Sequence, residues 1–275
     1  MEMRPIAHIK TDLPQKFGIP RNSFLAPHLQ GRIVFEPEFA LPQAVDGLEE
    51  FSHLWLLWEF ENGMPGGTAA DIARDAAGPA GRATAAAPVR DGEDDASAGV
   101  KAGESSARTT SGGPAAAPAW AATVRPPRLG GSERRGVFAT RSPFRPNPIG
   151  LTCVKLERVE LTDAGPVIHV LAVDLRDGTP IYDIKPYIPF ADCHPDATGG
   201  WIDRAPWHEL EVDFPSELQE RVPAPKLPGL IEVLRQDPRR AGSKHVPTRV
   251  YHLAYAGLDV SFTVDGDELH VVDVA

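Results

Sequence analysis

The stretch VRPPRLGGSERRGVFATRSPFRPNPIGL, from Val124 to Leu151, limits the fold more than any other part of the chain. Its prolines and glycines cannot sustain a long helix, so we expect short extended pieces and tight turns with backbone N–H groups available to a ligand. The stretch carries six arginines and one acid, Glu133, although the whole chain has a formal net charge of -10. Positive charge concentrated in an acidic protein indicates a surface that binds something anionic.

The whole chain has 275 residues, enough for one large domain or two modest ones, and its hydrophobic share of 42% is sufficient for a core. Its two cysteines, Cys153 and Cys193, provide neither a disulfide framework nor metal-ligand spacing, which fits a reducing cytosol. The start, MEMRPIAHIK, lacks the apolar run of a signal peptide, and no run of about 18 apolar residues occurs. We therefore expect a soluble, cytoplasmic protein without a membrane span or a metal.

Residues 63–123 differ in composition from the rest of the chain. Small and polar residues dominate this segment, and it offers few sizeable apolar side chains. Such a segment cannot offset the entropy of ordering its backbone, roughly 1–2 kcal/mol per residue. We expect a low-complexity, disordered insertion in a surface loop.

Runs typical of strands flank the insertion, which predicts one mainly β domain made of residues 1–62 and 124–205. One or two helical turns are expected in Gln43–Phe51, and a bulge in the strand that begins at Leu151. Val167–Leu175 is expected to be central in the sheet. The expected strands are Pro5–Ile9, Arg32–Phe35, His53–Phe60, Gly136–Thr140, Leu151–Leu161, Val167–Leu175 and Ile181–Ile188.

Residues 206–275 predict a small C-terminal α+β unit. Pro215–Leu234 has the pattern of a helix interrupted by prolines. Three alternating runs follow, and the Asp-Gly pair between the last two is a strong hairpin signal. The runs are Arg249–Tyr255, Leu258–Val264 and Glu268–Val272, with turns expected at Ala256–Gly257 and Asp265–Gly266.

Several common catalytic motifs are absent from the sequence. It contains no GxxxxGK[ST] phosphate loop, no HExxH, no CxxC and no GxSxG. Gly130 and Gly131 lie together, but no buried strand precedes them and no helical pattern follows. These absences argue against dehydrogenases, kinases, zinc hydrolases and serine hydrolases.

Two candidate clusters lie before the insertion. Lys16–Asn22 brackets an isoleucine between glycine and proline and ends in a donor-rich pair, so it could close over a ligand or be a solvated connector. The aromatic residues of Phe51–Phe60 are interpreted as core. Glu61 and Asn62, at the exit of that strand, are better placed to meet a ligand.

Two further clusters follow the insertion. In Ala139–Gly150, Arg141 and Arg145 can each fork onto a carboxylate or phosphate, and the prolines hold them with less loss of entropy. The alternative is a stiff loop with solvated arginines. The last cluster is Asp174–Tyr187. Its turn at Asp177–Pro180 presents a carboxylate, a hydroxyl and backbone amides, which suits a ribose or an adenine edge, although a plain turn fits the composition equally well.

Taken together, these motifs resemble those of the TsaA-like family. The matching segments are VRPPRLGG, GVFATRSPFRPNPIGL, DGTPIYDIKPYIPF, KFGIPR, FSHLWLL and QDPRR. The resemblance implies a β-barrel-type fold and use of S-adenosylmethionine to methylate N6 of threonylcarbamoyl-modified adenosine at position 37, in the anticodon loop of tRNA. It also implies a homodimer with the methyl donor near the subunit interface.

The resemblance also implies which residues bind the cofactor. They are Pro20, Arg21, Asn22, Glu61, Asn62, Arg141, Leu151, Asp177, Gly178, Thr179 and Pro180. The chain departs from the family pattern in two places, with Asn22 where glutamine is expected and Glu61-Asn62 where His-Gln is expected.

The remaining candidates concern RNA and the target atom. We expect RNA contacts from Arg125, Arg128, Arg134, Arg135 and Arg145, with Arg145 or its neighbours also suited to the threonyl carboxylate. Asn147, or a carbonyl of its turn, is the candidate hydrogen-bond acceptor near N6, and no catalytic base is assigned. The alternatives are a non-catalytic module that binds RNA or a nucleotide, and a methyltransferase with another substrate.

Overall fold

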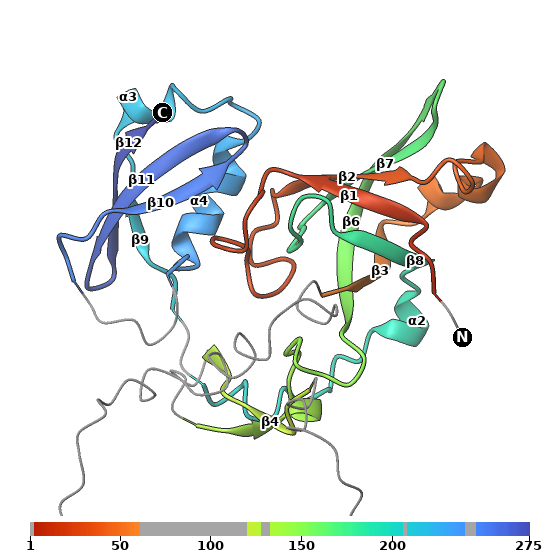
Figure 1. The fold of residues 1–275 in the computed structure, drawn as a ribbon, viewed down its shortest axis with the longest axis horizontal. Coiled ribbons are helices and arrows are strands. Elements are labelled where there is room, and N and C mark those ends of the chain that lie inside the picture. Colours follow the sequence, from red (N-terminus) through yellow and green to blue (C-terminus); the bar gives the residue numbers. More distant parts are fainter. Residues whose placement is uncertain (1–2, 61–119, 128–132, 206–207, 240–245) are drawn as a thin grey trace, which may run out of the picture.

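The structure is a computed structural model that describes residues 3–60, 120–127, 133–205, 208–239 and 246–275. The insertion expected to be disordered lies outside these ranges, apart from residues 120–123. The described part contains a closed barrel, a four-stranded sheet and a short two-stranded sheet (Figure 1). The expectation of a mainly β protein with a barrel and a C-terminal unit is confirmed.

The barrel has six strands in the order β1-β2-β7-β6-β3-β8, and all neighbours are antiparallel. Three short helices decorate the chain around it, namely two 3₁₀ turns before β3 and one helical turn after β8. The strands are β1 (Ala7–Thr11), β2 (Gln30–Phe35), β3 (His53–Glu59), β6 (Ile149–Thr162), β7 (Gly165–Leu171) and β8 (Pro180–Pro186). The helices are η1 (Pro42–Val45), η2 (Leu48–Glu50) and α2 (Pro189–Asp192).

Apolar side chains at every second position of the strands fill the inside of this barrel. Ile9 of β1 is paired with Ile33 of β2, and Ile33 is paired with Ile168 of β7, so three isoleucines share one level. All three are fully buried, whereas their sequence neighbours are exposed or only partly buried. A period of two in a closed sheet therefore separates an apolar interior from a polar exterior.

Two predictions about the strand that begins at Val167 are wrong, and the predicted bulge in β6 is confirmed. β7 ends at Leu171 and not at Leu175, because Ala172 has φ 63° and turns the chain out of the strand. β7 lies between β2 and β6, but a closed barrel has no edge, so no strand is central. The expected bulge in β6 is present as a register shift between Leu156 and Arg158.

The expected strand Gly136–Thr140 is mostly a 3₁₀ turn. Only a two-residue strand, β5 (Arg135–Gly136), forms there, and it pairs with β4 (Thr123–Val124). The chain then enters η6 (Val137–Ala139). Val137 is buried while Phe138 beside it is exposed, so this segment anchors itself through a single apolar side chain.

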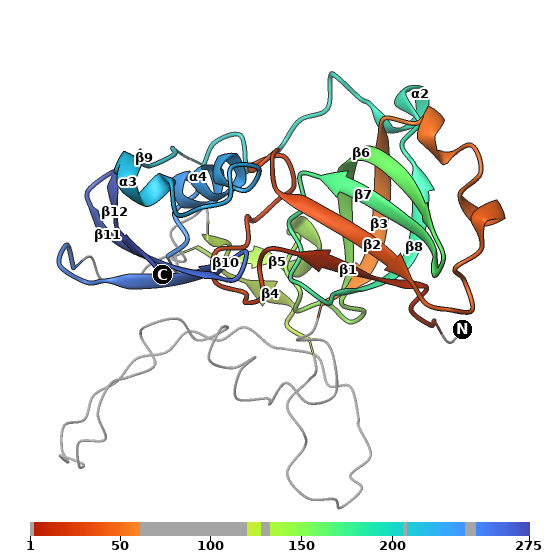
Figure 2. The same cartoon turned by 90° about the horizontal axis from the view of Figure 1, so that it is seen from above.

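The C-terminal unit is a sheet in the order β10-β11-β12-β9, with helices α3 and α4 beside it (Figure 2). The predicted interruption by prolines is confirmed, because two separate helices replace one. The hairpin joining β11 to β12 closes with Gly266 and Asp267 in the loop, one residue later than predicted. The elements are β9 (Glu211–Asp213), α3 (Ser216–Gln219), α4 (Leu227–Arg235), β10 (Tyr251–Tyr255), β11 (Leu258–Asp265) and β12 (Glu268–Val274).

The segment between β1 and β2 joins the C-terminal unit to the barrel. Leu13, Ala26 and Leu29 belong to the same buried cluster as the apolar face of α4 and the inner face of the C-terminal sheet. At the edge of this contact, Lys226 Nζ lies 2.6 Å from Asp12 Oδ2 and donates to Gln30 Oε1 at 2.9 Å. The loop that carries residues 20–24 is therefore held from both sides.

Candidate functional site

A chain of three polar side chains runs along one end of the barrel. The indole Nε1 of Trp58 donates to Thr152 Oγ1 at 3.0 Å, and Thr152 Oγ1 donates to Asp174 Oδ1 at 2.9 Å. Thr152 is buried at an inward-facing position of β6, where the strand pattern would otherwise place an apolar residue. Asp174 lies in the connection between β7 and β8. The network thus joins strands β3 and β6 to that connection.

Asp174 also holds the loop that contains residues 20–24. The backbone N–H of Ser23 donates to its carboxylate, and the guanidinium of Arg141 lies close enough to interact with it electrostatically. Arg141 Nη1 in turn donates to Asn22 Oδ1 at 3.4 Å. The structure therefore brings together two residues predicted from distant motifs, Asn22 and Arg141, and places Asp174 beside both.

Burial controls the charge of Asp174. Desolvation raises the pKa of its carboxyl from 3.8 to about 6, while the hydrogen bonds from Thr152 and Ser23 and the charge of Arg141 act in the opposite direction. At neutral pH the group is ionised, so the site presents one enclosed carboxylate next to one exposed guanidinium. A ligand that carries both a carboxylate and positive charge would be complementary to this pair.

Contacts within its own loop fix the position of Arg141. Thr140 Oγ1 donates to the carbonyl of Val137 at 2.8 Å and accepts from Ser142 N–H at 3.2 Å. Arg145 Nη1 donates to the carbonyls of Val137 at 3.2 Å and Thr140 at 2.7 Å. These bonds hold the backbone on either side of Arg141, and the expectation that the prolines hold its guanidinium stays a prediction.

Arg145 has a structural task in addition to any contact with RNA. Its Nη1 atom donates to both carbonyls and so links the backbone of Val137 to that of Thr140. Arg134 and Arg135 lie on and beside β5: Arg134 Nε donates to Thr123 Oγ1 at 2.9 Å, and Arg135 Nη2 donates to Glu133 Oε2 at 2.6 Å. Arg125 follows β4, on the same two-stranded sheet.

The predicted turn at Asp177–Pro180 lies against β1. Asp177 Oδ1 accepts from Thr11 N–H at 3.0 Å, and Gly178 N–H donates to the carbonyl of Ile9 at 2.8 Å. Thr179 is buried and its hydroxyl donates to the carbonyl of Arg176 at 2.7 Å. Within the described residues no hydrogen bond joins this turn to Asn22 or Arg141, although Asp177 follows Asp174 by only three residues.

The other predicted residues have different surroundings. Leu151 faces outward from β6, opposite in direction to Thr152, and is half exposed. Pro20 is buried and Arg21 is exposed. Asn147 is exposed, and its backbone carbonyl already accepts from Ile149 N–H at 2.8 Å. The remaining predicted residues, Glu61, Asn62 and Arg128, lie outside the described residues.

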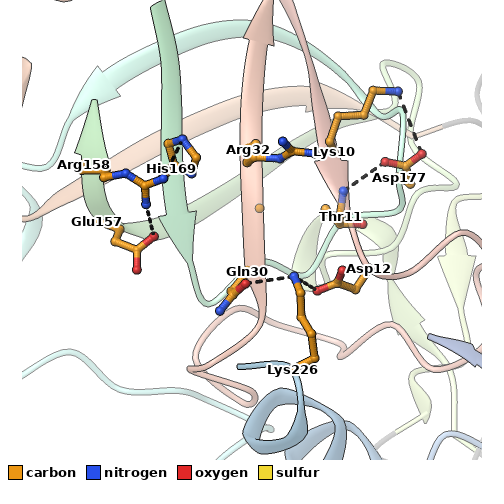
Figure 3. Close-up of a pocket in the computed structure, with 11 residues that line it drawn as sticks. Lys10, Thr11, Asp12, Gln30, Arg32, Glu157, Arg158, His169, Asp177 and Lys226 are labelled. Carbon is orange, nitrogen blue, oxygen red and sulfur yellow. Dashed lines mark hydrogen bonds and ion pairs between the residues drawn. The ribbon is translucent and has the colours of Figure 1, made fainter. Parts of the chain in front are cut away.

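A pocket of about 450 Å³ lies on the outer face of the barrel beside the start of α4 (Figure 3). Pairing in the sheet aligns Lys10, Arg32, His169 and Arg158 across four strands. Most of these charges are matched locally, since Lys10 lies 4.0 Å from Asp177 and Arg158 contacts acidic neighbours. Of the predicted site residues that the structure describes, only Asp177 lines this pocket.

Asp174, Thr152 and Trp58 were not among the predicted site residues. Asp174 lies between Val173 and Leu175, both buried, and a charged residue inside an apolar run is rarely buried without a partner. That interruption was the available signal. Elsewhere the described residues show no group of three potential metal ligands and no helix that could span a membrane.

The closed antiparallel barrel with an appended four-stranded sheet is distinct from the doubly wound dinucleotide-binding folds. A family model described as the tRNA-methyltransferase O N-terminal domain matches residues 8–111 and 107–193, and the TrmO C-terminal domain model matches residues 208–275. The chain belongs to the TrmO family, which confirms the TsaA-like resemblance.

Relatives and solved structures agree with this assignment. The chain is 34% identical over 249 residues to the Escherichia coli K12 protein named tRNA (adenine(37)-N6)-methyltransferase, covering 88% of this chain and 84% of that protein. It is 34% identical to a Pseudomonas aeruginosa protein named a putative S-adenosylmethionine-dependent methyltransferase, over 98% and 96% of the two chains. A crystal structure of TrmO from Pseudomonas aeruginosa has a TM-score of 0.65 and 28% identity, covering 100% and 98%.

Proposed function

We propose that this protein transfers a methyl group from S-adenosylmethionine to N6 of adenosine 37 in tRNA. The observation that carries the proposal is the convergence of Asn22, Arg141 and Asp174 at the barrel, in a chain whose two parts match the two TrmO models. The names of the relatives describe the same reaction for those proteins.

The described residues fit this methyl donor chemically. Arg141 can bind a carboxylate through its planar guanidinium, and the enclosed carboxylate of Asp174 complements positive charge. When bound, S-adenosylmethionine supplies a methyl group already activated by positive sulfur. The protein therefore has mainly to align the two reactants and to exclude water.

In our proposal the chain's own residues perform three tasks. Asn22 and Arg141 orient the donor, and the Asp174 network keeps their two segments together. Asn147, or a carbonyl near it, accepts a hydrogen bond from N6 and so directs its lone pair toward the methyl group. The attack forms the N–C bond and breaks the S–C bond, and the N6 proton leaves to solvent.

Several finer features belong to the same proposal. The adenosine carries a threonylcarbamoyl group, and an arginine of the loop binds its carboxylate. Pro20, Arg21, Glu61, Asn62, Leu151 and the turn Asp177–Pro180 complete the donor site. As the family resemblance implies, we also propose that the protein is a homodimer with the donor site near the subunit interface and that it works in the cytoplasm. Residues 1–62 with 124–205, and 206–275, are the proposed domains.

The direct test is transfer of label. The protein is incubated with methyl-labelled S-adenosylmethionine and bulk tRNA from a strain that lacks the modification, and the labelled nucleoside is identified by mass spectrometry. We expect label in N6-methylated threonylcarbamoyladenosine. Label in another nucleoside would indicate a different substrate, and binding of tRNA without any transfer would indicate a non-catalytic module.

A further inference from the structure

The side chain of Phe138 is exposed to solvent on the 3₁₀ turn η6. Its ring is 72% exposed, whereas the preceding residue, Val137, is 1% exposed and anchors the turn in the interior. A single exposed apolar residue is common and needs no explanation. This one differs in that side-chain hydrogen bonds hold the backbone on both sides of it.

Three side-chain bonds lock the turn that carries Phe138. Arg145 Nη1 donates to the carbonyls of Val137 and Thr140, and Trp201 Nε1 donates to the carbonyl of Ala139 at 2.9 Å. These carbonyls belong to residues on either side of Phe138. The ring is therefore presented to solvent by a preorganised backbone, and a ligand that covers it would order little additional chain.

A second aromatic ring lies beside Phe138. The ring of Trp120 has its centroid 6.4 Å away with an interplanar angle of 25°, and this side chain is itself 37% exposed. The pairing follows from the backbone, because Val137 N–H donates to the carbonyl of Ala122 and aligns the two segments. The guanidinium of Arg145 lies over the Phe138 ring, 5.6 Å from its centroid.

Several arginines lie around this ring pair. Arg135 is in the adjoining two-stranded sheet, where it pairs with Glu133, Arg134 directly precedes that strand, and Arg141 follows Phe138 by three residues. Exposed aromatic rings among arginines are the combination that binds single-stranded nucleic acid, since each base has a face that can stack and each phosphate has a charge.

The position along the chain relates this surface to the reaction. Three residues span at most about 10 Å when fully extended, so Phe138 cannot lie far from Arg141. Resting on the function proposed above, we propose that Trp120 and Phe138 form a stacking platform for an unpaired base next to adenosine 37 in the anticodon loop. The platform would hold the loop while the target base enters the donor site.

The test compares substitutions at Phe138 by their effect on RNA affinity. The RNA is a synthetic anticodon stem-loop with threonylcarbamoyladenosine at position 37, and its affinity is measured by fluorescence anisotropy. Phe138→Ala should weaken binding about 5- to 150-fold, the equivalent of one lost base stack. Phe138→Tyr, which keeps the ring face, should bind within about threefold of the wild type, and Phe138→Leu should be as weak as the alanine variant. Phe190→Ala removes a ring that is 91% exposed on α2 and should leave the affinity unchanged.

A second readout locates the stacked base. In two further RNAs, 2-aminopurine replaces one neighbour of adenosine 37, and its fluorescence should be quenched by the wild type in one of them and not by Phe138→Ala. S-adenosylmethionine binding by calorimetry should be the same for all Phe138 variants, which also reports that they fold.

The outcomes separate this inference from the proposed function. Unchanged RNA affinity in Phe138→Ala, or restored affinity in Phe138→Leu, would overturn the stacking platform while leaving the methyltransferase intact. A wild-type protein that binds S-adenosylmethionine but not the stem-loop would overturn both.

Discussion

Replacing Asp174 with asparagine should stabilise the protein at neutral pH. The amide has nearly the shape of the carboxyl group, and its oxygen can still accept hydrogen bonds from Thr152 and from Ser23 N–H. What it removes is a charge in a desolvated position. The substitution therefore isolates the energetic cost of keeping that charge inside the site.

The magnitude follows from the pKa of this carboxyl group. The pKa rises from 3.8 to about 6 on folding, so between these pH values the folded state binds the proton more strongly than the unfolded chain. Stability is consequently lost as the pH rises through this window, by about 3 kcal/mol in total, and changes no further above it. Asparagine cannot ionise, so the variant lacks this loss.

Urea unfolding of the two proteins measures the effect. We expect the free energy of unfolding of Asp174→Asn minus that of the wild type to increase by about 2.5 kcal/mol between about pH 4 and pH 7.5. Comparing the two proteins at each pH cancels the titration of other groups. A difference that stays constant with pH, or that shrinks as the pH rises, would refute the reasoning.

Three further predictions test other parts of the structure. In the wild type, the rate of methyl transfer should rise with pH through about pH 6 as Asp174 ionises. Asp174→Asn should be less active and should lack that rise. Equal pH profiles of the two proteins in steady-state assays would contradict a role for the charge. Gly150→Ala should destabilise the protein by about 1–3 kcal/mol in thermal unfolding, because its methyl group would overlap the Trp58 indole, whereas Gly136→Ala meets nothing within 4 Å and should be neutral. Arg134→Ala should reduce the slope of log affinity for RNA against log salt by about 0.7, for one lost phosphate contact. Arg4→Ala, which removes an exposed pair with Glu38 and a contact over the Phe39 ring, should leave that slope unchanged, and equal slopes for both variants would contradict a local RNA surface.

Alternation made the barrel strands visible in the sequence, but it could not show where each one ends. The apolar run from Val167 continues through Leu175, and both Val173 and Leu175 are indeed buried. The chain nevertheless leaves the strand at Ala172, because that residue adopts a left-handed conformation that composition does not predict. Burial and strand pairing are thus separate properties, and only burial followed from the pattern.

In the candidate site, too, the sequence predicted some residues and not others. The motifs identified Asn22 and Arg141, which the structure brings within 3.4 Å. Thr152 was missed because it lies within a run that resembles core. Asp174 begins the candidate cluster Asp174–Tyr187 but was given no role, because it also lies within an apolar run. Their significance depends on a hydrogen bond between segments that are neighbours only in the closed barrel. Polar residues at inward-facing positions deserve to be considered as site candidates for this reason.

The most direct measurement of the central claim is calorimetric titration of S-adenosylmethionine into the wild type and into Arg141→Ala. The claim is that Arg141, held beside Asn22 and Asp174, belongs to the methyl-donor site. The account predicts saturable binding to the wild type and binding weakened at least about tenfold in the variant, since a charge-assisted bond contributes about 1.5–3 kcal/mol. Equal affinity in the two proteins, or no binding to the wild type, would contradict it.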